Sequence, residues 1–206
     1  MSRAIRAAIA FTALAAVIIQ YFTFIAGAEI GLIGASIRYF SYFTVLTNTL
    51  VAFGWGMNAL RPDSVPGRWF ARDDVRTAVT SYIVLVGVVY HLLLAADHDP
   101  QGLQWFANLL LHYVVPAAVF LEWLLGSPDR TARFSQAFVW QIYPFAYTAY
   151  SLIKGAFTGF YPYPFLDVNT LGYSGVAYQL AGMIVAFTIT SLAFIAIGRM
   201  QARLAR

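Results

Sequence analysis

The chain contains no cysteine and very little charge. Only 11% of its 206 residues are Asp, Glu, Lys or Arg, whereas 60% are hydrophobic. The absence of cysteine excludes disulfides, thiolate nucleophiles and cysteine-bound zinc. The scarcity of charge excludes an ordinary soluble domain, because so few polar side chains would not cover the surface of a folded unit of this size. Lipid is therefore the expected solvent for most of the chain.

Six apolar stretches divide the sequence. They cover residues 5–26, 38–60, 77–96, 105–125, 138–156 and 178–198. Each is long enough to cross a hydrocarbon core of ~30 Å as an α-helix, which satisfies its own backbone polar groups. The first stretch resembles a signal peptide, but its apolar run is longer than such segments have, so we expect it to be retained. The sequence predicts an all-α, polytopic membrane protein: a single domain over 1–206 forming a six-transmembrane-helix bundle.

The basic residues predict the orientation of this bundle. Eleven of the thirteen Lys and Arg residues lie at the N-terminus, in alternate connections and at the C-terminus: Arg3, Arg6, Arg61, Arg68, Arg72, Arg76, Arg130, Arg133, Arg199, Arg203 and Arg206. Cytoplasmic segments retain basic residues, so both termini are predicted to be cytoplasmic, in the cell membrane. The net charge of +4 is spread over these segments, which argues against a nucleic-acid partner.

Polar side chains inside the expected spans are the candidates for function, since a polar group in hydrocarbon needs a partner or a cavity. Thr44, Thr47 and Asn48 recur at helical spacing and fall along one face of their span. Asn108 and His112, four residues apart, share a face of another span. At a rise of ~1.5 Å per residue, the candidates on both spans reach a similar depth, roughly 9–10 Å from the expected outer ends. Both sets are predicted to lie in the outer half of the bilayer.

Each candidate also has a purely structural explanation. A membrane threonine often bonds to the carbonyl one turn back, and threonine or asparagine can hold helices together. Lys154 can extend to the lipid headgroups. The aromatic, proline-rich segment 161–165 is either the cap of a cavity or part of an interfacial aromatic belt.

Three short strings, in order along the chain, resemble a known family. Residues 42–48 (Tyr-Phe-Thr-Val-Leu-Thr-Asn) are similar to the threonine-bearing segment of the androgen-induced and androgen-dependent tissue-factor-pathway-inhibitor-regulating proteins. His112, followed by Pro116 and Glu122, is similar to their catalytic-histidine segment, and residues 163–167 resemble the string after their fifth span. The resemblance implies an integral-membrane hydrolase of fatty acid esters of hydroxy fatty acids, with Thr44 as nucleophile and His112 as base.

The chemistry of these side chains is compatible with that reaction. A threonine hydroxyl becomes an effective nucleophile when a neighbouring base accepts its proton, and neutral imidazole suits this near pH 7. The developing oxyanion needs hydrogen-bond donors, for which Asn48, Thr47 and His91 are candidates. Asn108 is the candidate for orienting the His112 ring.

The substrate's free carboxylate also needs a partner. Arg38 and Lys154 are the basic residues that depart from the cytoplasmic pattern, and both are expected near the outer ends of spans. We expect them to hold this carboxylate at the interface. Lipid is thus the expected partner, with no cofactor and no metal, and the number of associating copies stays open.

The sequence also leaves other functional interpretations open. His91 and His112 could ligate a haem from adjacent spans. His91, His98 and His112, with Asp97 and Asp99, could bind a zinc ion that activates water. A non-catalytic transporter, lipid-binding protein or scaffold would use the polar stripes to line a path or to hold helices together.

Overall fold

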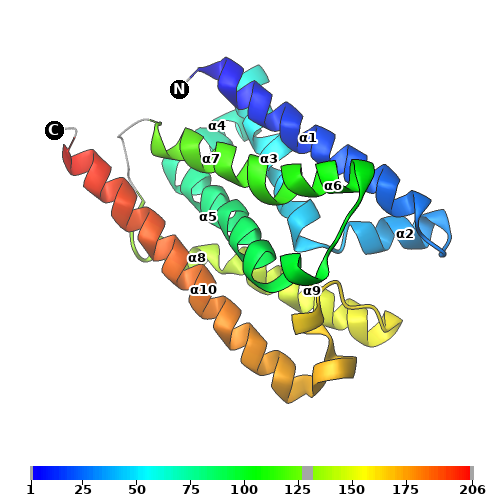
Figure 1. Cartoon of the computed structure of the whole chain (residues 1–206). Coiled ribbons are helices and arrows are strands. Elements are labelled where there is room, and N and C mark those ends of the chain that lie inside the picture. Colours follow the sequence, from blue (N-terminus) through cyan, green and yellow to red (C-terminus); the bar gives the residue numbers. More distant parts are fainter. Residues whose placement is uncertain (1, 127–131, 205–206) are drawn as a thin grey trace.

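The computed structural model describes residues 2–126 and 132–204, and every regular element within these ranges is helical (Figure 1). The predicted all-α fold class is thereby confirmed. The elements are α1 (Arg3–Ala26), α2 (Leu32–Tyr39), α3 (Phe43–Leu60), α4 (Val65–Ala71), α5 (Asp73–Val89), η1 (Tyr90–Leu94), η2 (Ala95–Asp97), α6 (Gly102–Leu109), η3 (Leu110–Val114), α7 (Val115–Leu124), α8 (Gln136–Trp140), α9 (Ile142–Thr158), η4 (Pro164–Leu166) and α10 (Val168–Leu204).

Four helical stretches in the described ranges are long and apolar enough to cross a membrane: Arg3–Ala26, Asp73–Asp97, Gly102–Leu124 and Val168–Leu204. They correspond to four of the six expected spans. The expected spans 38–60 and 138–156 overlap shorter helices: α3, of 18 residues, and α9, of 17 residues, which ends at Thr158. The structure therefore supports a membrane protein with four such helices, and six crossings remain a prediction.

The stretch 38–60 differs from the expected single helix. α2 ends at Tyr39, and α3 begins at Phe43 after an extended Tyr42. Side chains from other helices bind the backbone near this break: the Tyr147 hydroxyl donates to the Ser41 carbonyl at 2.9 Å. The Tyr39 hydroxyl in turn donates to the Val17 carbonyl of α1 at 2.5 Å. The break gives α3 a helix N-terminus inside the bundle.

Two π-helical turns interrupt the neighbouring helices. η1 continues α5, and η3 lies between α6 and α7. Pro116 has no N–H to donate to the carbonyl of His112, so one hydrogen bond of the regular helix is missing where η3 meets α7. That carbonyl lies against Gly87 of α5, where a Cβ atom would approach it to 2.7 Å. Turns of this kind are frequent at functional sites.

A buried carboxylate joins several helices at one end of the bundle. Glu122 of α7 is 1% exposed and accepts hydrogen bonds from Arg6 of α1 at 2.9 Å and from Arg76 of α5 at 2.8 Å. Arg6 also donates to Asn58 of α3. Gln201 near the end of α10 donates to the Leu124 carbonyl of α7. The beginning of α1, the beginning of α5 and the ends of α7 and α10 therefore meet at the same end (Figure 1).

We predict that Glu122→Gln lowers the free energy of unfolding by about 3–5 kcal/mol, because Arg6 and Arg76 would keep their charges without a buried counter-ion. Thermal or denaturant unfolding of the purified protein in detergent measures the change. Glu29→Gln, at an exposed acid between α1 and α2, is the matched control and should change stability by no more than about 0.5 kcal/mol. Equal changes in the two variants would contradict the prediction.

Candidate active site

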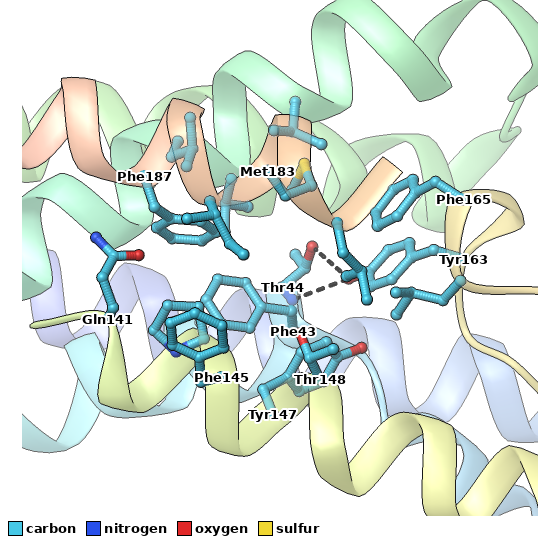
Figure 2. A pocket seen from close by; sticks show the side chains of 17 residues that line it. Phe43, Thr44, Gln141, Phe145, Tyr147, Thr148, Tyr163, Phe165, Met183 and Phe187 are labelled. Carbon is cyan, nitrogen blue, oxygen red and sulfur yellow. Dashed lines mark hydrogen bonds between the residues drawn. The ribbon is translucent and has the colours of Figure 1, made fainter. Parts of the chain in front are cut away.

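Thr44 lies in the first turn of α3, at the break described above. The first N–H groups of a helix have no partner within it. The N–H of Thr44 donates to the Tyr163 hydroxyl at 3.2 Å, and the Thr44 hydroxyl lies 3.3 Å from the same oxygen (Figure 2). Tyr163 belongs to the connection between α9 and α10. Two segments far apart in the sequence thus meet at the hydroxyl proposed for catalysis.

Tyr163 is held in place by its neighbours. Its ring is buried and stacks on Phe165 with 5.0 Å between the ring centroids. Gly155 of α9 allows this connection to lie close, because a Cβ atom there would overlap the ring of Tyr161 at 2.0 Å. Burial raises the pKa of Tyr163 to about 12. Its hydroxyl therefore keeps its proton near neutral pH and remains able to donate a hydrogen bond.

His112 is oriented by Asn108, one turn earlier. The imidazole Nδ1 lies 3.1 Å from the Asn108 carbonyl oxygen. A carbonyl only accepts, so we assign the proton to Nδ1, which leaves the lone pair of Nε2 available as a base. The ring also stacks on Tyr90 of η1, with 3.8 Å between centroids, and the Asn108 amide donates to the Tyr90 hydroxyl at 2.7 Å. The main chain and the side chain of Asn108 thus both fix the imidazole.

Thr44 and His112 line the same cavity of about 240 Å³. Its other lining residues are Gln20, Phe24, Tyr39, Tyr42, Val45, Tyr90, His98, Gln104, Asn108, Leu111 and Tyr163. Within the described ranges no hydrogen bond joins Thr44 to His112 directly. The two side chains face this cavity, called the chamber below, and a reacting group could lie between them there.

Several polar groups of this chamber were not singled out from the sequence. The Gln20 side-chain oxygen is buried and has no hydrogen-bond partner among the described residues. The Tyr90 hydroxyl lies 3.2 Å from Nδ1 of His98. Tyr90 and Gln20 lie within expected spans and carry no sequence signal that they face a cavity. These two residues come from different helices, so no spacing within one helix could have identified them. Tyr163 belongs to the segment 161–165, which was expected either to cap a cavity or to lie in an aromatic belt, and it lines this cavity.

Asn48 and Thr47 do not line this cavity. The Asn48 amide nitrogen donates to the carbonyls of Thr44, at 2.9 Å, and Leu111, at 3.3 Å. These two bonds use both N–H hydrogens, which leaves none for an oxyanion. Thr47 is fully buried, with its hydroxyl 3.2 Å from that of Tyr143. In this arrangement both residues connect α3 to neighbouring helices, as their structural explanation predicts.

His91 also lies outside the cavity. Its side chain is exposed, and its Nδ1 is 3.2 Å from the Tyr113 hydroxyl. His91 and His112 do line an open groove on another face of the same helices. Within the described ranges, no group of three or more His, Asp or Glu residues is placed to hold a metal ion. Among the described residues, the structure therefore gives the zinc alternative no set of ligands. The haem alternative stays a prediction, because His91 and His112 line the same groove.

Arg38 and Lys154 converge beside the cavity. Both cations lie over the ring of Phe160, at 4.8 Å and 4.7 Å from its centroid. Lys154 also donates to the hydroxyl of Ser41. Phe160 packs edge-on against Tyr42, which lines the cavity. The two cations therefore contact Phe160, which in turn contacts a residue of the cavity wall. Neither cation has an acidic partner among the residues that the structure describes.

Comparisons with protein families, with curated proteins and with solved structures found no match to this chain. The family resemblance stated above therefore rests on its three short strings alone.

We predict that Gly87→Ala destabilises the fold by about 1–3 kcal/mol, because the added methyl group would be forced against the His112 carbonyl. Gly182→Ala, on an open face of α10, is the control and should be neutral or stabilising by up to about 1 kcal/mol. Unfolding in detergent measures both. A neutral Gly87→Ala would show that α5 and η3 are not in close contact.

Proposed function

We propose that this protein is an integral-membrane lipid ester hydrolase with Thr44 as nucleophile and His112 as general base. The proposed substrates are fatty acid esters of hydroxy fatty acids or similar acyl esters. The observation that carries the proposal is the single cavity lined by both side chains, with Thr44 in the first turn of a helix. The family resemblance supports the same assignment of roles.

The position of Thr44 favours an acyl transfer reaction. The N-terminus of a helix carries a partial positive charge, which stabilises a nearby anion. When Thr44 attacks an ester, the oxyanion forms on the former carbonyl oxygen of the substrate and would lie near the N-terminus of α3. The Tyr163 hydroxyl, next to Thr44 and protonated, is the proposed donor to this oxyanion. It takes the place that sequence reasoning gave to Asn48.

The reaction proceeds in two steps. The Thr44 oxygen attacks the ester carbonyl carbon while its proton passes to Nε2 of His112, and the carbonyl π electrons move to the oxyanion. Collapse of this intermediate breaks the ester C–O bond, and the leaving alkoxide takes the proton from His112. Water, deprotonated by the same nitrogen, then attacks the acyl-threonine, which releases the fatty acid and restores the Thr44 hydroxyl.

Six membrane crossings, with both termini cytoplasmic, are part of the proposal. The contacts of Glu122 hold the beginnings of α1 and α5 at one end of the bundle. The chain must therefore return from the far end of α1 before α5 starts, and α3 supplies that crossing. The ends of α7 and α10 also meet, through Leu124 and Gln201, so α8 and α9 must carry the chain back between them. In the cell membrane, the basic connections would be cytoplasmic.

A fluorophosphonate probe for serine and threonine hydrolases tests the nucleophile. We expect labelling of the wild-type protein in detergent, loss of labelling in Thr44→Ala, and a decrease of about 100-fold or more in His112→Ala, because general-base assistance is removed. Thr44→Ser should restore labelling. Thr47→Ala, on the same helix but outside the cavity, is the matched control.

Two outcomes would contradict the hydrolase assignment. Labelling that survives Thr44→Ala places the nucleophile elsewhere. Absence of labelling and of ester cleavage in a folded wild-type sample favours the non-catalytic readings. The absorption spectrum of that sample also tests the haem alternative, since two axial histidines would give a strong haem band.

Lys154→Met tests the role proposed for the two cations. We expect KM to rise about tenfold for esters that carry a free carboxylate, because one charge-assisted hydrogen bond is lost, and to stay unchanged for neutral esters. Steady-state kinetics on a matched acid and methyl-ester pair measure this difference. An equal loss on both substrates would show that Lys154 only supports the fold.

A further inference from the structure

A second cavity, of about 150 Å³, also reaches Thr44 (Figure 2). Thr44 and Tyr163 line both cavities. The chamber that contains His112 is otherwise formed largely by α1, α3, α6 and η3, whereas the second is enclosed by α5, α9, α10 and the connection before α10. The pair Thr44 and Tyr163 thus forms the boundary between two spaces on different sides of α3.

The second cavity is apolar. Its lining consists mainly of aliphatic and aromatic side chains such as Leu85, Leu180, Met183 and Phe187. The Tyr147 hydroxyl, on its wall, is already donated to the Ser41 carbonyl. A cavity of about this volume lined by Leu, Ile and Phe stays dry and accepts a benzene-sized apolar group. The space therefore suits a hydrocarbon segment of about six carbons better than water.

This cavity also opens on the side of the bundle, at the exposed surface of α9 and α10. Phe145 of α9 and Ile184 of α10 line it, yet their side chains are 50% and 39% exposed. The surrounding surface of these helices is apolar, with Ile142 and Val185 also exposed. Such a face contacts lipid when the helices cross a membrane. A hydrocarbon chain in the bilayer would meet the opening without passing through water.

We infer that the acyl chain of a bilayer lipid enters sideways between α9 and α10 and occupies the second cavity, with its carbonyl carbon at Thr44. The inference rests on the proposed hydrolase function for the identity of this chain. His112 protonates the leaving alcohol, so that half of the ester must lie on the His112 side. The acyl half, which stays on Thr44, then extends to the opposite, apolar side. The part of a longer chain beyond about six carbons remains in the bilayer.

The binding site can be tested without relying on catalysis. A fatty acid that carries a diazirine within about the first six carbons of its chain, the part expected inside the cavity, is photolysed with the full-length wild-type protein and with Thr44→Ala. We expect crosslinks within residues 141–148 and 180–187 of both proteins, displaced by excess palmitate. Leu180→Trp, which fills the cavity, should reduce this labelling by about tenfold or more, since buried methylene groups lose their site. Met183→Phe is a second, smaller filling variant.

Ile189→Trp is the matched control, because Ile189 is 61% exposed on α10 and does not line the cavity. Melting temperatures establish that each variant is folded. The inference is supported if both segments are labelled in the wild-type protein and the filling variants lose this labelling. This holds even if the wild-type protein cleaves no ester, a result that would contradict only the proposed hydrolase activity. Labelling elsewhere, or labelling unaffected by either folded filling variant, overturns the inference even if Thr44 is the nucleophile.

Discussion

An interrupted helix inside apolar surroundings is possible only when other groups bind its freed backbone N–H and C=O groups. The break before α3 meets this requirement through tyrosines from distant segments. Tyr147 donates to the Ser41 carbonyl, and Tyr163 accepts from the Thr44 N–H. These contacts keep a helix N-terminus in the interior and fix Thr44 in its first turn. The proposed oxyanion site and both cavities depend on this arrangement.

The same constraint shapes the opposite wall of the chamber. Pro116 removes the N–H that would bind the His112 carbonyl, and Gly87 allows α5 to lie against that oxygen. The π-helical turn that results presents the imidazole to the cavity, where Tyr90 and Asn108 fix its plane. Both halves of the proposed catalytic pair thus lie where a regular helix is interrupted, and where the local backbone alone would be unstable.

The division of space around Thr44 connects the fold to a substrate with two unlike halves. The lining of the His112 chamber includes tyrosine, asparagine, glutamine and histidine side chains, whereas the lining of the second cavity is mainly aliphatic and aromatic. Arg38 and Lys154 add positive charge near Tyr42, at the edge of the polar side. An ester that also carries a carboxylate matches this distribution better than a neutral, symmetric lipid does. The buried Glu122 and its two arginine partners lie at the end of α7. We expect them to stabilise the fold and not to take part in the proposed ester hydrolysis.

Hydropathy alone was enough to predict the all-α class and the apolar stretches, because it is a local property of the chain. The similar depth predicted for Thr44 and His112 assumed one continuous helix from Arg38 to Thr44, whereas α2 ends at Tyr39 and α3 begins at Phe43. The sequence did not determine that 38–60 is broken, since the partners of that break, Tyr147 and Tyr163, come from other parts of the chain. It placed Thr47 and Asn48 beside Thr44 on one helix face, but neighbouring helices occupy their hydrogen bonds. Whether a polar group faces a cavity or joins two helices depends on how the helices pack, and packing is not a local property of the sequence.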